Sequence, residues 1–282
     1  MNRALFFFLT CLFALTVNAQ GKRQYVGYKF IENKGQWEDH VKYRADLKAG
    51  HLYVEEEGLL FDFVDAEQMD RYVRAHYDKS LPRNFEPLKH HAYRVRFEGM
   101  NADPQLLEEM QTPEYYNYFL GKDRSSWASK AHGFHRIRYK DLYDGIDMQF
   151  YSKYFNLKYD FIVHPGADPA AIRLTYEGAD DLAIKNGKLH VYTSVNHIIE
   201  NQPYAYQEIK GEKIEIDCHY QLEGSSISFT FPNGFDEKHK LIIDPKVWEY
   251  DYASNPDAAP EKRLEYMLGY QMSRMCREKG AV

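Results

Sequence analysis

Short runs that alternate apolar and polar residues recur along the chain from about residue 25 to residue 244. The clearest run is His91–Phe97, whose apolar positions are Tyr93, Val95 and Phe97. Successive side chains of a β-strand point to opposite faces of the sheet, so such a run can bury one face and leave the other in water. The pattern predicts a chain built mainly of strands.

The same alternation predicts further strands, and Gly, Pro, Asn or Asp residues separate most of them. These strands are Val41–Ala45, His51–Val54, Leu59–Phe63, Tyr115–Leu120, Ile146–Phe150, Leu157–Val163, Ile172–Tyr176, Leu182–Ile184, Leu189–Val191, Tyr204–Ile209, Lys213–Tyr220, Ile227–Phe231 and Leu241–Ile243. Three hairpins are expected, with turns at Asn186-Gly187, at Lys210-Gly211 and at Gly58, where a positive φ is expected.

Two segments have helical spacing. Ala66–Tyr77 carries residues at spacings of three and four (Met69, Tyr72, Val73 and His76), and residues 78–90 after it are expected to form a loop. Glu261–Arg277 carries a stripe of Leu and Met residues. Short strands without regularly alternating long helices favour an antiparallel sandwich over a βαβ fold. We therefore expect an all-β fold, an antiparallel β-sandwich of one large unit or two tandem lobes, with a short helical insertion and a C-terminal helix.

The first 19 residues are typical of a secretory signal peptide. Arg3 supplies a positive charge, residues 4–17 are almost wholly apolar, and cleavage is expected between Ala19 and Gln20. The apolar run is shorter than the roughly 20 residues that a membrane-spanning helix needs. We expect an exported protein (periplasmic, outer-surface or extracellular) with no transmembrane segment after signal removal. Residues 20–248 would form the β domain, and residues 249–282 a loop and the C-terminal helix.

Composition supports this description. The 24 Tyr and 17 Phe residues give an aromatic content of 16%, typical of strands with one packed and one half-wet face. The net charge of −6 counts against a nucleic-acid partner, since phosphate binding needs a basic surface. Beyond the expected signal peptide the cysteines are Cys218 and Cys276, too few for a disulfide framework, so a packed core must supply stability. Cys218 is expected to be a small buried residue of that core.

Several phrases, taken in order, resemble an amino-terminal domain of unknown function that opens many large exported proteins of gliding bacteria. The phrases are Phe30–Trp37, Asn117–Gly121, Arg138–Asp147, Tyr159–Pro169, Ile172–Asp180 and Gln202–Glu208. The resemblance covers about residues 28–248. It implies an exported module and offers no catalytic residues to transfer.

Relatives of that kind continue into β-propeller repeats of the SBBP type or immunoglobulin-like PKD modules, often with a sorting domain for type IX secretion. This chain continues after Trp248 with a loop and the predicted helix. Two alternatives stay open: a stand-alone version of the domain, or a shortened gene product. Type IX export is not implied for either.

Three aspartates, Asp141, Asp144 and Asp147, recur every third residue around Gly145. Oxygen ligands on a tight turn could hold Ca²⁺, although the spacing lacks the distal Glu of an EF-hand. The interpretation we favour is that these acids end strands and cap the turn at Asp144-Gly145. A zinc site is not expected, because alternation places His132 and His135 on opposite faces of a strand.

No nucleophile elbow, phosphate-binding loop or Cys–His pair appears, so neither an enzyme nor a cofactor is expected. Exposed aromatic rings can stack on sugars, and Tyr115, Tyr118 and Trp127 are the best candidates, with ordinary sandwich core as the preferred interpretation of all three. The leading hypothesis is a non-catalytic exported or cell-surface module, structural or adhesive, whose partner is a surface protein or a polysaccharide. The alternative is a carbohydrate-binding module or a carbohydrate-active hydrolase.

Overall fold

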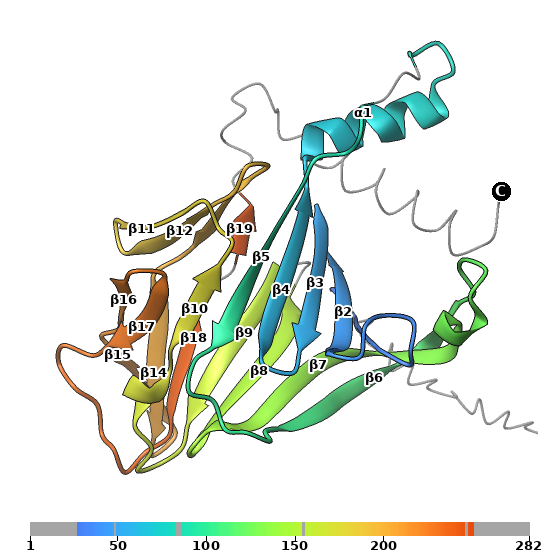
Figure 1. The fold of residues 1–282 in the computed structure, drawn as a ribbon. Coiled ribbons are helices and arrows are strands. Elements are labelled where there is room, and N and C mark those ends of the chain that lie inside the picture. The colour runs from blue at the N-terminus through green and yellow to red at the C-terminus, as the bar shows by residue number, and fades with distance from the viewer. Residues whose placement is uncertain (1–26, 48, 83–85, 154–155, 246–247, 251–282) are drawn as a thin grey trace, which may run out of the picture.

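Strands dominate the computed structural model, which describes residues 27–47, 49–82, 86–153, 156–245 and 248–250 (Figure 1). The expected signal peptide, with its cleavage site between Ala19 and Gln20, lies outside the described residues. So does the expected C-terminal helix Glu261–Arg277, together with Cys276.

Within the described residues the strands form one sheet of 15 strands and one of four. One half of the large sheet has the order β15-β14-β18-β9-β8-β7, and β6 pairs with β7 beside this path. The bounds are β6 Gln105–Tyr118, β7 Ala128–Tyr143, β8 Ile146–Lys153, β9 Asn156–Val163, β14 Pro203–Ile209, β15 Glu212–Ile216 and β18 Leu241–Pro245.

The other half has the order β2-β3-β4-β5-β10-β17-β16, and β1 (Phe30–Glu32) joins the halves by pairing with both β7 and β2. The bounds are β2 Val41–Leu47, β3 Gly50–Glu55, β4 Gly58–Val64, β5 His90–Phe97, β10 Leu174–Glu177, β16 His219–Glu223 and β17 Ser226–Thr230.

The small sheet has the order β11-β12-β13-β19 and lies at one end of the large one (Figure 1). Its strands are β11 Asp181–Lys185, β12 Lys188–Tyr192, β13 His197–Glu200 and β19 Trp248–Tyr250. The helical elements of the described residues are α1 Ala66–Tyr77 and two 3₁₀ turns, η1 Arg124–Ser126 and η2 Pro169–Ala171.

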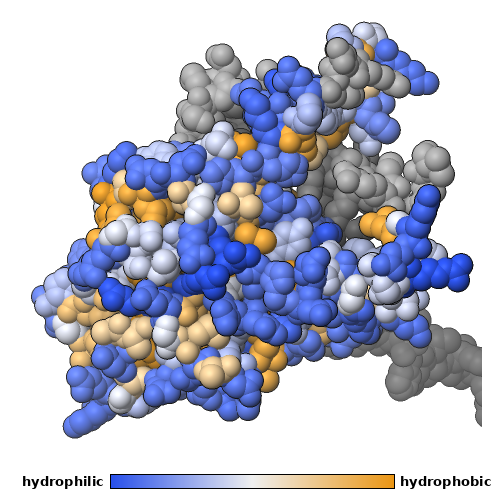
Figure 2. All heavy atoms as spheres, viewed as in Figure 1, coloured by the Kyte–Doolittle hydropathy of each residue, from blue (hydrophilic) through white to orange (hydrophobic). Residues whose placement is uncertain are grey.

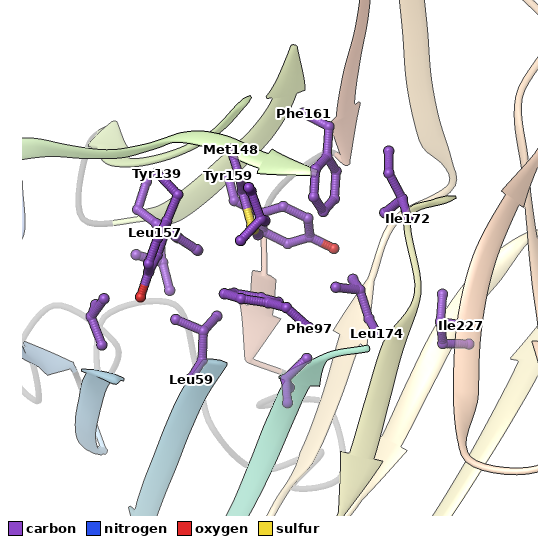
Figure 3. Packing of buried hydrophobic residues seen from close by; sticks show 14 of the residues in the cluster. Leu59, Phe97, Tyr139, Met148, Leu157, Tyr159, Phe161, Ile172, Leu174 and Ile227 are labelled. Atoms are coloured by element: carbon purple, nitrogen blue, oxygen red, sulfur yellow. The ribbon is translucent and has the colours of Figure 1, made fainter. Parts of the chain in front are cut away.

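The large sheet folds over so that its two halves face each other. Its end strands β15 and β16 are consecutive in the chain, and the two residues between them can span only about 11 Å. Across the interior, Phe97 of β5 meets Tyr139 of β7 edge to face at 5.6 Å, and Phe161 of β9 meets Phe229 of β17 at 5.8 Å. Figure 3 shows these layers pointing their side chains toward one another. The expected all-β antiparallel sandwich is confirmed.

Two of the expected hairpin turns have the predicted backbone. The Asn186-Gly187 and Lys210-Gly211 turns place all four residues at positive φ, between 52° and 82°, which suits the twist of a two-residue hairpin. The turn before β4 differs from expectation, because Gly58 does not adopt a positive φ. A Cβ built on Gly58 would lie 2.2 Å from the Val95 carbonyl oxygen, so glycine is needed there for the close approach of β5.

The predicted helix is confirmed over Ala66–Tyr77, where the Asp65 side chain accepts a hydrogen bond from the Gln68 amide at 2.9 Å. The buried positions differ from the expected stripe, since Gln68 and Ala75 are the buried residues. The Gln68 side chain accepts a hydrogen bond from the Lys89 amide at 2.8 Å and so ties the helix to the residue directly before β5. Cys218 is buried as expected, at 2% exposure.

One buried carboxyl connects the three layers. Glu200, on β13 of the small sheet, is 1% exposed. Tyr159 of β9 donates its hydroxyl to this carboxyl at 2.8 Å, and Tyr176 of β10 donates at 3.1 Å. The hydroxyl of Tyr220, on β16, donates to the neighbouring Asn201 carbonyl at 3.2 Å. The small sheet is therefore bonded through a single side chain to both halves of the large one.

Burial governs the ionisation of this group. Removal from water raises the pKa of Glu200 to about 7, although the tyrosine hydroxyls favour its charged form. The Tyr93 hydroxyl is buried nearby without a hydrogen-bond partner among the described residues. Burial, together with the negative charge of Glu200, raises the pKa of Tyr93. Near neutral pH the centre of the molecule therefore holds a carboxyl between its neutral and charged forms.

Replacement Glu200→Gln is expected to remove a pH dependence of stability. The folded protein binds the Glu200 proton more tightly than the unfolded chain, whose pKa is near 4.5. As the pH rises from about 4.5 to about 7, the free energy of unfolding of the wild type should therefore fall by up to about 3 kcal/mol relative to that of the variant. Above about pH 7 the difference should stay constant. Urea unfolding of both proteins at pH 5, 6, 7 and 8 measures the difference between their free energies of unfolding. Other titrating groups, such as Asp160, contribute equally to both proteins and drop out of this difference. A constant difference across this range would contradict the prediction.

Candidate functional site

The hairpin of β6 and β7 is built from the two longest described strands, and it extends well beyond the sandwich (Figure 1). The half of β7 near the turn pairs with β6 and, at Gly133 and Phe134, with β1. Met110 and Lys130 adopt positive φ near register shifts in this hairpin. Such bulges bend a strand pair and redirect its side chains. The outer half of the hairpin therefore forms an arm.

Exposed apolar side chains are concentrated on this hairpin. Of the ten large hydrophobic side chains that are exposed in the described part of the chain, six belong to the hairpin: Leu107, Met110, Tyr115, Phe119, Leu120 and Trp127. Leu120 is the most exposed of them, at 77%. Figure 2 shows apolar surface at the end of the arm among hydrophilic atoms. We call Phe119, Leu120 and Trp127 the tip.

The tip is held in place by ring and cation contacts. Phe119 meets Trp127 edge to face at 5.6 Å, and the Arg124 guanidinium lies 5.3 Å from the centre of the Trp127 ring. Asp123 caps η1, because its side chain accepts a hydrogen bond from the Ser125 amide at 2.9 Å. The hydrogen bonds from Ser125 lower the pKa of this exposed carboxyl. A surface that is already ordered loses less entropy when it binds.

The aromatic candidates from the sequence all lie on this arm, in different settings. Tyr115 is 53% exposed and Trp127 is 37% exposed, so the preferred assignment of these two to the core is wrong. Tyr118 is half-buried against Trp37, with ring centres 5.3 Å apart. Phe119 and Leu120 are not among the candidates predicted from the sequence, although they directly precede Gly121 and a polar turn.

Residues 111–134 of the arm carry three cations, Lys122, Arg124 and Lys130, and two carboxylates, Glu114 and Asp123, although the chain as a whole is acidic. Four exposed cationic side chains lie at or beside the tip: Lys34, Lys122, Arg124 and Lys130. Lys34 reaches the arm, since its Nζ donates to the Lys130 carbonyl at 3.0 Å. The net charge of the whole chain is −6. The tip therefore combines apolar rings with positive charge.

The three aspartates around Gly145 are not brought together as a cation site. Asp141 and Asp144 are exposed, whereas Asp147 is 4% exposed. One Asp147 oxygen accepts the Asp141 amide at 2.9 Å and the other lies 3.2 Å from His164 Nε2. Among the described residues, no group of three or more His, Cys, Asp or Glu side chains could hold a metal ion.

A cleft of about 840 Å³ opens at one end of the sandwich, above the core rings Phe97 and Tyr139. Its wall is the β5–β6 connection, and its lining carries two cations and five carboxylates: Lys42, Arg96, Glu56, Glu57, Glu98, Asp103 and Glu177. The Arg96 guanidinium binds Glu177 at 2.8 Å and Glu57 at 3.3 Å. Lys42 binds Glu56 at 2.6 Å, and this contact lowers the pKa of Glu56. The cleft was not predictable from the sequence, because residues of β2, β5, β7 and β10 line it together.

A family model described as a domain of unknown function, DUF7948, matches residues 30–246. The chain belongs to the DUF7948 family. The match covers both sheets up to the end of β18 and includes the arm and the cleft. No curated protein and no solved structure matches the chain. In the part of the chain that the structure describes, no helix is both long and apolar enough to cross a membrane.

Polar substitutions at the tip should leave the stability of this DUF7948 domain almost unchanged. Phe119→Ser and Leu120→Ser are expected to change the free energy of unfolding by less than about 0.5 kcal/mol, because their side chains lie mostly in water. Phe150→Ala, at a fully buried position, should lower it by about 3–5 kcal/mol. Urea unfolding measures all three. Tip variants that unfold as easily as the core variant would show that the tip is packed.

Proposed function

We propose that the chain is a non-catalytic exported module that binds a surface partner through the tip of the β6–β7 arm. The observation that carries the proposal is the gathering of exposed Phe119, Leu120 and Trp127 at the end of a long hairpin. Monomeric proteins rarely expose contiguous apolar groups unless these make contacts. Export is inferred from the signal-like residues 1–19, and a gliding-bacterial source from the phrases quoted above.

The composition of the tip suits recognition. Binding energy at protein interfaces is concentrated in Trp, Tyr and Arg side chains that become buried together. Trp127 and Arg124 already stack, so both can be covered by one partner. The neighbouring cations favour a partner with acidic groups, since opposite potentials speed the encounter. An acidic surface protein is the partner we favour, in a structural or adhesive role, and an acidic polysaccharide is the alternative partner.

The charged cleft supports a second candidate function, a carbohydrate-binding module or a carbohydrate-active hydrolase. Its volume is within the range that holds small ligands, and its carboxylates could bind hydroxyl groups. Hydrolysis of a glycosidic bond requires one carboxyl group that donates a proton. Glu56 instead binds Lys42, and Glu57 and Glu177 bind Arg96, so these three carboxylates are already engaged in ion pairs. Binding is therefore the stronger version of this candidate.

Three variants separate the two candidates. The tip variant combines Phe119→Ser, Leu120→Ser and Trp127→Ser, and the cleft variant combines Glu98→Gln and Asp103→Asn. The matched control, Ile184→Ser with Ile214→Ser, removes exposed apolar side chains far from the tip in the sequence. The chain from residue 20 to residue 282 is immobilised, exposed to outer-surface proteins and to a glycan array, and the affinity of any retained partner is measured.

The tip variant is expected to bind a surface protein at least about tenfold more weakly than the wild type. A loss of about 1.4 kcal/mol of binding free energy is enough for this change. The control and the cleft variant should bind as the wild type does. Glycan binding that the cleft variant loses and the tip variant keeps would favour the second candidate. Failure to retain any partner at micromolar protein would reject adhesion.

A further inference from the structure

Two histidines lie side by side on the outward face of the small sheet. In the pairing of β12 with β13, Tyr192 lies opposite His197 and His190 lies opposite Ile199. Alternate residues of the same strands, among them Val191 and Ile198, are buried. His190 and His197 are therefore diagonal neighbours on the face that points away from the core, and both are half-exposed. This face does not include the arm or the cleft.

The two imidazole rings approach through one nitrogen each. His190 Nδ1 lies 2.9 Å from His197 Nε2, and the ring centres are 5.0 Å apart. The Tyr192 ring stacks on His197 at 4.3 Å with an angle of 9° between their planes. Lys185 Nζ donates to the Tyr192 hydroxyl at 2.7 Å and so holds that ring. Tyr192, itself held by Lys185, therefore restricts the orientation of the His197 ring.

The two nitrogens are close enough to occupy neighbouring positions around one ion. Two imidazole nitrogens at about 2.05 Å from a metal ion lie about 2.9 Å apart at 90° and about 3.3 Å apart in a tetrahedron. The observed 2.9 Å is the length of the hydrogen bond between the rings, and it equals the spacing of neighbouring positions of a square-planar or octahedral ion, toward which the rings would have to turn. Among divalent ions that imidazole binds, Cu²⁺ and Ni²⁺ prefer such positions, whereas Zn²⁺ prefers the tetrahedron.

We propose that His190 and His197 form a two-nitrogen site for Cu²⁺ or Ni²⁺ on the outward face of β12 and β13. The ion would replace the hydrogen bond between the two rings. Both coordinating nitrogens must then lack a proton, so His190 carries its hydrogen on Nε2 and His197 on Nδ1. A neutral ring only changes tautomer in this step, and no proton is gained or lost.

The remaining coordination positions belong to water or to another molecule. No group of three or more His, Cys, Asp or Glu side chains converges in the described part of the chain, so the protein supplies two ligands from these residues. Lys185 and Lys188 lie near His190. Their positive charges weaken the attraction of the site for a cation. We therefore expect micromolar affinity and an ion that exchanges readily.

The test is a calorimetric titration of the chain from residue 20 to residue 282 with Cu²⁺, with glycine as a weak competing ligand. The wild type should bind one Cu²⁺ ion with micromolar affinity after correction for the Cu²⁺ that glycine binds. His190→Gln and His197→Gln should each weaken this binding about tenfold or more. His219→Gln is the control, because this histidine is half-exposed like the pair but binds Asp217, at 2.9 Å, instead of another histidine. Circular dichroism verifies that each variant is folded.

Electron paramagnetic resonance of the Cu²⁺ complex should show coupling to two nitrogens in the wild type and to fewer in either pair variant. Unchanged affinity in both pair variants would overturn the proposal. So would an equal loss in His219→Gln, or a spectrum without nitrogen coupling. Because no tip or cleft residue is changed, these outcomes do not depend on the function proposed above.

Discussion

The buried hydrogen bonds to Glu200 are the constraint on which the arrangement of the layers depends. A carboxyl group removed from water needs partners, and those it finds here come from β9 and β10, in opposite halves of the large sheet. The small sheet can dock only where these hydroxyls meet, because any other place would leave the group without partners. Apolar burial drives the layers together but is not directional, whereas the carboxyl specifies one docking position.

This arrangement also determines which part of the chain stays outside the core. The two halves of the large sheet are joined by the three residues of β1, which pairs with β7 only near Phe134. Beyond that point the hairpin extends away from the sandwich (Figure 1), and side chains such as Leu120 remain in water. The body and the arm therefore differ in their roles: the body fixes the geometry, and the arm presents apolar side chains that contribute little to folding.

The strands were predictable from the sequence because alternation is a local property, and the Asn186-Gly187 turn because its backbone conformation depends on two adjacent residues. The order of the strands was not predictable. Alternation states which face of β5 is buried, but not that β4 and β10 are its neighbours. The exposure of Tyr115 was hidden for the same reason, since an aromatic strand looks alike whether or not a second layer covers it. The cleft and the Glu200 contacts join residues from distant strands.

Charge and apolar surface at the tip act over different distances, and this limits what the proposed partner must offer. At physiological ionic strength the field of Lys122 and Arg124 is screened within about 8 Å, so it can orient an approaching acidic surface only in the last step of the encounter. Affinity must then come from covering the rings of Phe119 and Trp127, since exposed ion pairs contribute little. A partner that offers only negative charge would bind weakly and lose its binding in salt. A partner with an apolar recess rimmed by acidic groups would satisfy both features of the tip.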